Sequence, residues 1–190
     1  MNLHRLRWAG LVAVLTGVQY LVLEAVAAAA WHDPPYRYAV NYISDLGAAG
    51  SPLAWVMNTA FVVQGMGFLV LGLAIAAQLR GPRRFLVAGL AVAHAVGNVL
   101  VAAFPSSTGS GFHLAGAVLA IGGGNLAALF VGLRGLPVLG LVSVLLLGRI
   151  GAGEIDGLWE RGGVYSITAW EIVFGVVLLV RSRLGESTVL

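Results

Sequence analysis

The sequence contains no cysteine and no lysine, and charged residues of any kind are scarce. Without cysteine, the chain has no disulfide framework, no thiol nucleophile and no thiolate metal site. All 11 basic residues are arginines, which excludes Schiff-base chemistry on a lysine of this chain. The arginines stand singly or in small groups between apolar runs rather than in a stripe, so we expect no nucleic-acid partner.

Apolar residues dominate the composition. They make up 59% of the 190 residues, only 10% are charged, and the mean hydropathy is +0.91. A soluble domain has about 25% charged residues, so this chain has too few charges to cover a surface in water. The composition predicts an integral membrane protein with a single domain over residues 1–190.

Six apolar segments predict an all-α, polytopic transmembrane bundle. They are Trp8–Trp31, Leu53–Leu79, Phe85–Phe104, Phe112–Leu133, Leu136–Gly153 and Gly163–Val180. The first covers 24 residues, which is too long for the apolar part of a cleaved signal peptide, at about 7–15 residues. The fifth is the shortest apolar run, and it spans the bilayer only if Arg149 lies at the membrane edge or snorkels.

The distribution of arginines predicts the orientation. If both termini lie in the cytoplasm, the cytoplasmic segments hold eight arginines, and the outer segments hold Arg37, Arg149 and Arg161. A bias of this kind favours the cytoplasmic placement of the arginine-rich side. We therefore expect a multi-pass protein of the cell membrane with N- and C-termini in the cytoplasm. Residues 32–52 and 154–162 then form the two longer outer segments.

Polar residues inside apolar segments are costly in lipid, so each needs a partner or a use. Those in the outer parts of the predicted helices are Glu24, Asn58, Asn98, His113, Arg149 and Glu171. This one-sided distribution predicts an outward-facing polar cavity. The two glutamates are candidate acids; the alternative is a structural ion pair with Arg149, or a protonated carboxyl bonded to a neighbouring helix. Asn98 is also typical of hydrogen bonding between helices.

Motifs for metals and cofactors do not occur in the sequence. His32, His94 and His113 fall on different segments without the paired spacing of metal ligands. A GxSxG element, a P-loop and a dinucleotide-binding fingerprint are also missing. We predict no metal and no cofactor.

The chemically richest segment is the first outer one, which has three tyrosines and several polar residues between Tyr36 and Gly47. Ser44 or Asp45 is placed to cap a short helix or a re-entrant turn, with Gly47 at a positive φ. Capping alone would explain this pattern. The candidate site residues in the segment are Arg37, Tyr42, Ser44 and Asp45.

At these residues the sequence resembles a known family. The heptapeptide Asn41–Gly47, together with Phe104-Pro105 and the later His113, resembles a bacterial membrane family catalogued as domain of unknown function 998. The Ile-Ser-Asp element is also similar to the DRAM/Sfk/Frag group of six-helix membrane proteins, which has Thr at the position of Leu46. The resemblance covers essentially the whole chain. It implies a six-helix membrane fold and a lipid-related role, and it supplies no catalytic residues.

The function that we expect first is the binding of a lipid or another amphipathic small molecule in the outer cavity. Asp45, Arg37 and His113 would contact the polar head of the ligand, and Glu24 and Asn98 would line the deeper part. A chain of this size also suits a subunit or chaperone that acts through a protein partner, or a homo-oligomer.

The alternative is a membrane-embedded enzyme, for example a cyclase, that acts on a lipid or isoprenoid by acid catalysis. Glu24 would be the proton donor, because a carboxyl in an apolar pocket can hold a proton for transfer. Asp45 and Glu171 are the second candidates. This alternative predicts an aromatic-lined cavity that converges on Glu24, with side chains such as Tyr20, Trp31, Tyr42, Phe61 and Trp170.

Overall fold

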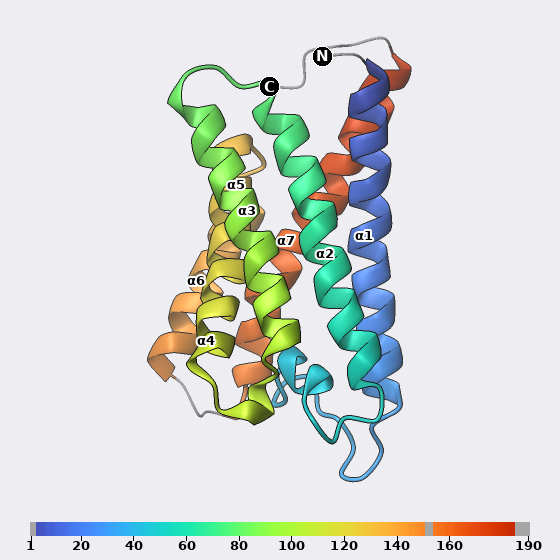
Figure 1. Cartoon of the computed structure of the whole chain (residues 1–190), viewed down its shortest axis with the longest axis vertical. Helices are drawn as coiled ribbons and strands as arrows, with labels where there is room; N and C mark the ends of the chain where they lie inside the picture. Colours follow the sequence, from blue (N-terminus) through green and yellow to red (C-terminus); the bar gives the residue numbers. More distant parts are fainter. Residues whose placement is uncertain (1–2, 151–153, 185–190) are drawn as a thin grey trace.

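The computed structural model describes residues 3–150 and 154–184, which form an all-α bundle of six helical rods (Figure 1). Five rods are long and apolar enough to cross a membrane: α1 (Leu3–Ala29), α2 (Ala54–Ala76), α3 (Pro82–Ala103), a fourth rod over Gly111–Val131, and α7 (Asp156–Arg183). The shorter α6 (Gly135–Ile150) is also apolar. The predicted multi-pass membrane bundle is confirmed.

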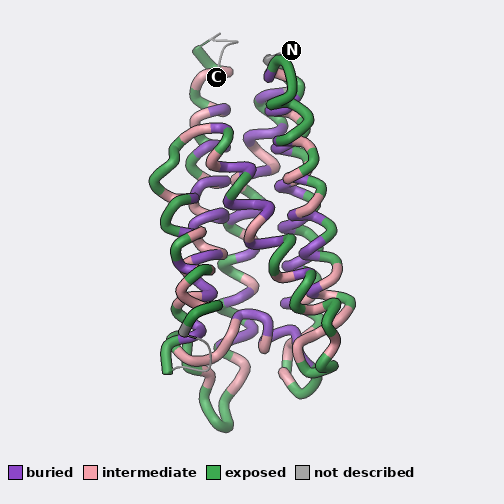
Figure 2. The backbone as a smooth tube through the Cα atoms, turned by 90° about the vertical axis from the view of Figure 1, so that its left-hand side faces the viewer, coloured by how far each residue is buried: buried purple, intermediate pink, exposed green. Residues whose placement is uncertain are grey.

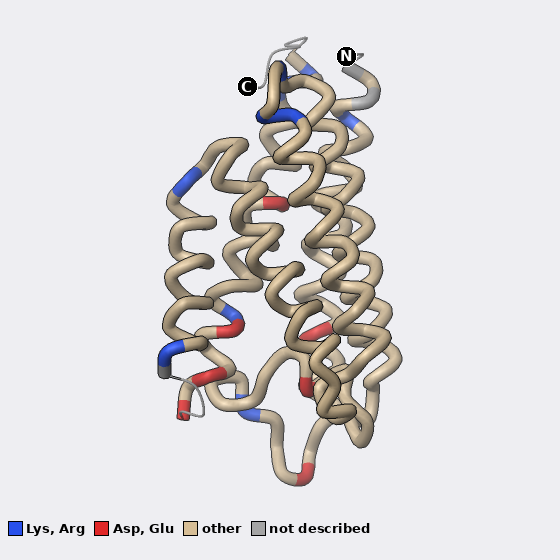
Figure 3. The backbone as a smooth tube through the Cα atoms, turned by 60° about the vertical axis from the view of Figure 1, so that its left-hand side comes forward, with Lys and Arg blue, Asp and Glu red and all other residues tan. Residues whose placement is uncertain are grey.

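The two ends of the bundle differ. Helix α1 begins and α7 ends at one end, which we call the terminal end, while residues 30–53, the first loop, cover the opposite loop end (Figure 1). Charged residues gather at these ends, with isolated acidic positions between them (Figure 3). Placement of the terminal end in the cytoplasm stays a prediction.

The packing order follows from the helix contacts. Helix α1 packs on α2 and α7, and α3 packs on α2 and the fourth rod. Helix α6 packs on α7 and on α5 (Gly123–Val131), the last part of the fourth rod. Buried residues lie towards the middle of the bundle (Figure 2). Large apolar residues such as Leu15, Trp55 and Leu145 are exposed. An apolar exterior is what a helix bundle needs when lipid is its solvent.

The fourth rod changes helix type along its length. Helix α4 (Gly111–Ala117) passes into a π-helical turn, η3 (Val118–Gly122), and then into α5 (Gly123–Val131). Single π-helical turns inside α-helices are frequent at functional sites. Here the turn presents the carbonyl oxygen of Ala120 to Nδ1 of His94 on α3, at 2.7 Å.

Helix α7 begins at Asp156, so the predicted start at Gly163 is wrong. Residues 156–162 form helical turns instead of an outer segment. The carboxyl of Asp156 lies in the first turn, where a negative charge complements the helix dipole. Gly162 lies within the helix and allows close packing, because a Cβ on it would lie 2.3 Å from Oγ of Ser143 on α6.

The predicted fifth helix, Leu136–Gly153, corresponds to α6. Its predicted end at Gly153 lies outside the described residues. The 16 residues of α6 rise by only about 24 Å, less than the roughly 30 Å of a bilayer core. Arg149 is exposed on the last turn, where it can snorkel to the membrane surface.

The first loop folds back onto the bundle through a 3₁₀ turn, η1 (Ile43–Gly47). Asp45, one of the two predicted capping residues, accepts a hydrogen bond from the backbone N–H of Tyr42 at 3.0 Å. The predicted positive φ of Gly47 is wrong. The glycine is required for space instead, because a Cβ there would lie 2.3 Å from Oδ1 of Asn58. A second 3₁₀ turn, η2 (Ser106–Thr108), lies at the same end.

Candidate functional site

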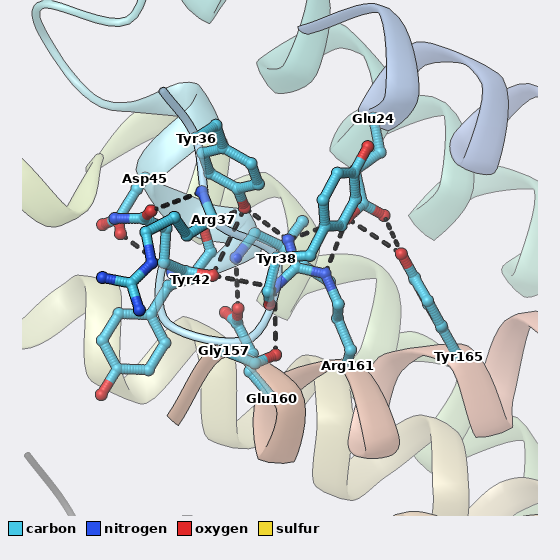
Figure 4. Close-up of polar contacts among 12 residues, drawn as sticks. Glu24, Tyr36, Arg37, Tyr38, Tyr42, Asp45, Gly157, Glu160, Arg161 and Tyr165 are labelled. Carbon is cyan, nitrogen blue, oxygen red and sulfur yellow. Dashed lines mark hydrogen bonds and ion pairs between the residues drawn. The ribbon is translucent and has the colours of Figure 1, made fainter. Parts of the chain in front are cut away.

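Arg161, on the second turn of α7, holds the first loop against the bundle (Figure 4). Its Nη1 donates to three backbone carbonyl oxygens, those of Tyr38 (2.5 Å), Asn41 (2.8 Å) and Gly157 (3.0 Å). Its Nη2 donates to the hydroxyl of Tyr36. The planar five-donor guanidinium suits such a set of acceptors better than an ammonium does. Arg161 therefore joins residues 36–41 of the first loop to α7.

The same guanidinium forms a buried ion pair with Glu24 of α1. Nε of Arg161 donates to Oε1 of Glu24 at 3.1 Å, and Nη2 lies 3.1 Å from the same oxygen. The hydroxyl of Tyr165 lies 3.0 Å from both oxygens of Glu24. Both carboxyl oxygens are thus engaged, and the Glu24 side chain is only 1% exposed. This ion-pair cluster, formed by Glu24, Arg161, Tyr36 and Tyr165, connects α1, α7 and the first loop.

The alternative role predicted for Glu24 named the wrong arginine. Arg149 lies exposed on α6, and the arginine that pairs with Glu24 is Arg161. The reason is the early start of α7: a residue assigned to a loop lies instead on a helix and projects its side chain into the bundle.

A groove of about 400 Å³, the lateral groove, separates the loop-end halves of the fourth rod and α6. Its polar lining, at the loop end, consists of Tyr42, Ser44, Ser106, His113 and Glu160. Its apolar lining consists of Leu114, Ala117, Val118, Ile121, Val144 and Leu147, with Gly148 beside them. From His113 to Ile121 the fourth rod rises by about 12 Å. Leu114 and Val118 are exposed, so the groove opens sideways.

Glu160 lines the lateral groove and also a smaller cavity behind it. The residue is 8% exposed, and its Oε2 accepts a hydrogen bond from the backbone N–H of Ile43. Within residues 3–150 and 154–184, no hydrogen-bond donor contacts Oε1. One oxygen of this buried carboxyl, which borders both spaces, therefore has no donor in the described part of the chain.

The smaller space, the inner cavity, holds about 40 Å³ between α2, α3, η3 and α7, enough for a few water molecules. His94 donates from Nδ1 to a backbone carbonyl, and its Nε2 accepts from Nδ2 of Asn98 at 3.2 Å. Gln64 also lines the cavity, and its buried Oε1 has no partner within the described part of the chain. Tyr20 and Phe61 contribute aromatic walls, but Glu24 lines neither space.

Glu171 lies near the middle of α7 and is fully buried. Its carboxyl accepts hydrogen bonds from Oγ1 of Thr16 on α1 (2.9 Å) and from Nε2 of Gln64 on α2 (2.5 Å). No arginine within the described ranges forms an ion pair with it. The predicted outer position is wrong, because α7 begins earlier and places this residue about 22 Å along the helix.

A family model described as "Protein of unknown function (DUF998)" matches residues 14–177. The chain belongs to this family. The match contains the ion-pair cluster, the lateral groove, the inner cavity and Glu171. These features therefore lie within the region that the family model describes. The description of the family assigns no activity to them. No curated protein and no solved structure matches the chain. The similarity to the DRAM/Sfk/Frag group stays a prediction.

Four of the residues predicted to bind a ligand line the spaces of this DUF998 protein. Tyr42, Ser44 and His113 line the lateral groove, while Asn98 lines the inner cavity. Burial raises the pKa of Tyr42 to about 12, and the hydrogen bond that its hydroxyl donates to Asp156 (3.0 Å) adds to the rise. The phenol therefore stays protonated at neutral pH.

The other predicted residues lie beside the groove or away from it. Asp45 supports its loop-end rim, where Oδ1 accepts from the hydroxyl of Ser106 at 3.4 Å. Asn58 donates to the carbonyl oxygen of Gly47 at 3.0 Å and lines neither space. Arg37 and Arg149 are exposed and line neither space.

The site also contains four residues that the sequence reasoning missed: Tyr36, Glu160, Arg161 and Tyr165. Two of them, Glu160 and Arg161, follow from one error, the late start assigned to α7. The spacing held a usable signal, since Gly157, Arg161 and Tyr165 are four residues apart and lie on one helix face if the helix starts at Asp156.

Proposed function

We propose that this DUF998 protein binds an amphipathic molecule, a membrane lipid or a smaller analogue, in the lateral groove, and that it does so in the cell membrane. The observation that carries the proposal is the polarity of the groove, which is polar at the loop end and apolar over about 12 Å below it. Because the groove opens sideways, a ligand enters from the bilayer without passing its apolar part through water.

The lining residues divide between head and chain. Tyr42, Ser44 and His113 contact the polar head. Nδ1 of His113 lies 2.9 Å from the carbonyl oxygen of Phe104, which leaves Nε2 for the ligand. The apolar side chains of the fourth rod and α6 contact the chain of the ligand. Asp45 acts indirectly, through its hydrogen bonds to Tyr42 and Ser106.

The enzyme alternative has less support from the geometry. Glu24 is engaged by Arg161 and Tyr165 and faces neither the groove nor the inner cavity. A general acid must reach the group that it protonates. We therefore do not assign a reaction.

The proposal is tested by native mass spectrometry and by lipid analysis of the purified protein. Val118→Trp places a large side chain in the groove at a position that is 60% exposed, so the fold should tolerate it. Val22→Trp, at 52% exposure on the lipid-facing side of α1, is the matched control. We expect a co-purified amphipath in the wild type and in Val22→Trp, and its loss in Val118→Trp. An adduct pattern that is the same in all three proteins would contradict groove binding.

A further inference from the structure

The loop end of the lateral groove presents hydrogen-bond acceptors. Glu160 lines the groove, and its Oε1 has no hydrogen-bond donor in the described part of the chain. In the neutral imidazole of His113, Nε2 is an acceptor, because Nδ1 donates to the carbonyl oxygen of Phe104. The hydroxyl of Ser44 lines the same end and accepts as well as donates. A group that offers several donors would satisfy all three.

Among the described residues, no arginine lines the groove. Arg161 follows Glu160 in the chain, but its donors are engaged by Glu24, Tyr36 and three backbone carbonyl oxygens. Arg37 and Arg149 are exposed and do not line the groove. A phosphate or carboxylate head placed here would be buried next to the Glu160 carboxyl without a counter-charge, which is unfavourable.

We infer that the head of the ligand is an ammonium group, held by Glu160 with Ser44 and His113. This inference rests on the proposed function, since it names the chemical class of the molecule in the same groove. An ammonium carries three donors and no acceptor, which matches a set of three acceptors at one end of the groove. Its charge also compensates the buried carboxyl, and a charge-assisted hydrogen bond is stronger than a neutral one. The ligand is then an amphipathic amine.

Three probes with the same ten-carbon chain separate the head-group classes: decylamine, decyl phosphate and decanol. Each is titrated onto the detergent-solubilised full-length protein, and adducts are counted by native mass spectrometry. We expect decylamine to bind about 10-fold or more tightly than decanol, and decyl phosphate to bind weakest, because a hydrogen bond to a charged group is worth roughly one to two powers of ten in affinity.

Glu160→Gln keeps an oxygen that accepts from Ile43 and removes the charge. It should lower the affinity for decylamine about 10-fold and leave that for decanol nearly unchanged. Glu154→Gln, which alters an exposed acid of the same end, is the matched control and should change neither.

The outcomes distinguish the two claims. Decylamine preference that disappears in Glu160→Gln supports the inference. If decyl phosphate binds as tightly as decylamine to the wild type, and Val118→Trp abolishes both adducts, the ammonium assignment is wrong and the proposed function stands. If Val118→Trp changes no adduct of any probe, the groove does not bind amphipaths and both claims fail. The wild-type comparison needs no variant, so a folding defect of Glu160→Gln does not prevent the test.

Discussion

At the scale of single residues, the most consequential contact is the ion pair between Glu24 and Arg161. Two charges gain little from pairing inside a bundle unless their remaining donors and acceptors are also satisfied. Here Tyr165 donates a hydrogen bond to the Glu24 carboxylate, and the Arg161 guanidinium donates to Tyr36 and to three carbonyl oxygens. The pair therefore holds the first loop in place, and this loop contributes Tyr42 and Ser44 to the polar end of the lateral groove.

Removing one partner of this pair should be costly. Arg161→Leu leaves the Glu24 carboxylate buried and uncompensated, and we expect a loss of about 3–5 kcal/mol in the free energy of unfolding. The double variant Glu24→Gln/Arg161→Leu should recover part of this loss. Thermal unfolding in detergent, followed by tryptophan fluorescence, measures both. Arg37→Leu removes an exposed loop arginine and serves as the control; a similar loss in Arg37→Leu and Arg161→Leu would rule out the special role of the pair.

A second residue-scale prediction concerns Glu171. Its carboxyl accepts from Thr16 and Gln64, and Thr16 has a further acceptor in the carbonyl oxygen of Val12 (2.8 Å). Glu171→Gln keeps an accepting oxygen, whereas Glu171→Leu leaves the Gln64 amide without its partner. We expect Leu to lower the free energy of unfolding by about 1–3 kcal/mol relative to Gln. Equal melting temperatures of the two variants would show that the hydrogen bonds contribute nothing.

At the scale of helices, small residues decide how closely the rods approach. A Cβ on Gly97 of α3 would lie 2.3 Å from the backbone N of Ala120 and 2.5 Å from the carbonyl oxygen of Gly116, both on the fourth rod. The contact places α3 against the π-helical turn and thereby positions the hydrogen bond between His94 and Ala120. Close backbone contact of this kind is typical of membrane helices.

Gly97→Ala should therefore destabilise the bundle. Backbone atoms cannot move aside as a flexible side chain can, so we expect a loss of about 1–3 kcal/mol from overpacking. Gly89→Ala is the matched control on the same helix, because a Cβ there has no heavy atom within 4 Å. Melting temperatures of both variants decide the matter, and the packing argument fails if Gly97→Ala melts no lower than Gly89→Ala.

Most of the helices could be predicted from sequence because a membrane-spanning helix must be apolar over nearly its whole length. The same rule failed at the start of α7. Residues 154–161 include four charged side chains, which hydropathy alone assigns to a loop, although Asp156, Glu160 and Arg161 are buried on the helix. Their burial depends on partners from α1 and the first loop, which lie far away in the sequence. No local pattern encodes such partners.

At the scale of the whole molecule, the lateral groove results from the way α6 packs on its neighbours. Helix α6 packs on α7 and α5, while the groove separates it from α4 towards the loop end. The one-sided distribution of polar residues in the sequence indicated a site at this end. Its walls could not be predicted, because they depend on how far α4 and α6 diverge and on the π-helical turn between α4 and α5.

The orientation of the whole bundle is the last prediction. Eight of the 11 arginines belong to the segments at the terminal end, which the positive-inside bias places in the cytoplasm. The absence of cysteine makes a direct test simple, because any introduced thiol is unique. We expect Ala49→Cys, exposed in the first loop, to react with a membrane-impermeant maleimide in intact cells. Leu184→Cys, 68% exposed at the end of α7, should react only after the cells are permeabilised. The reverse labelling pattern would place the lateral groove on the cytoplasmic side and refute the predicted orientation.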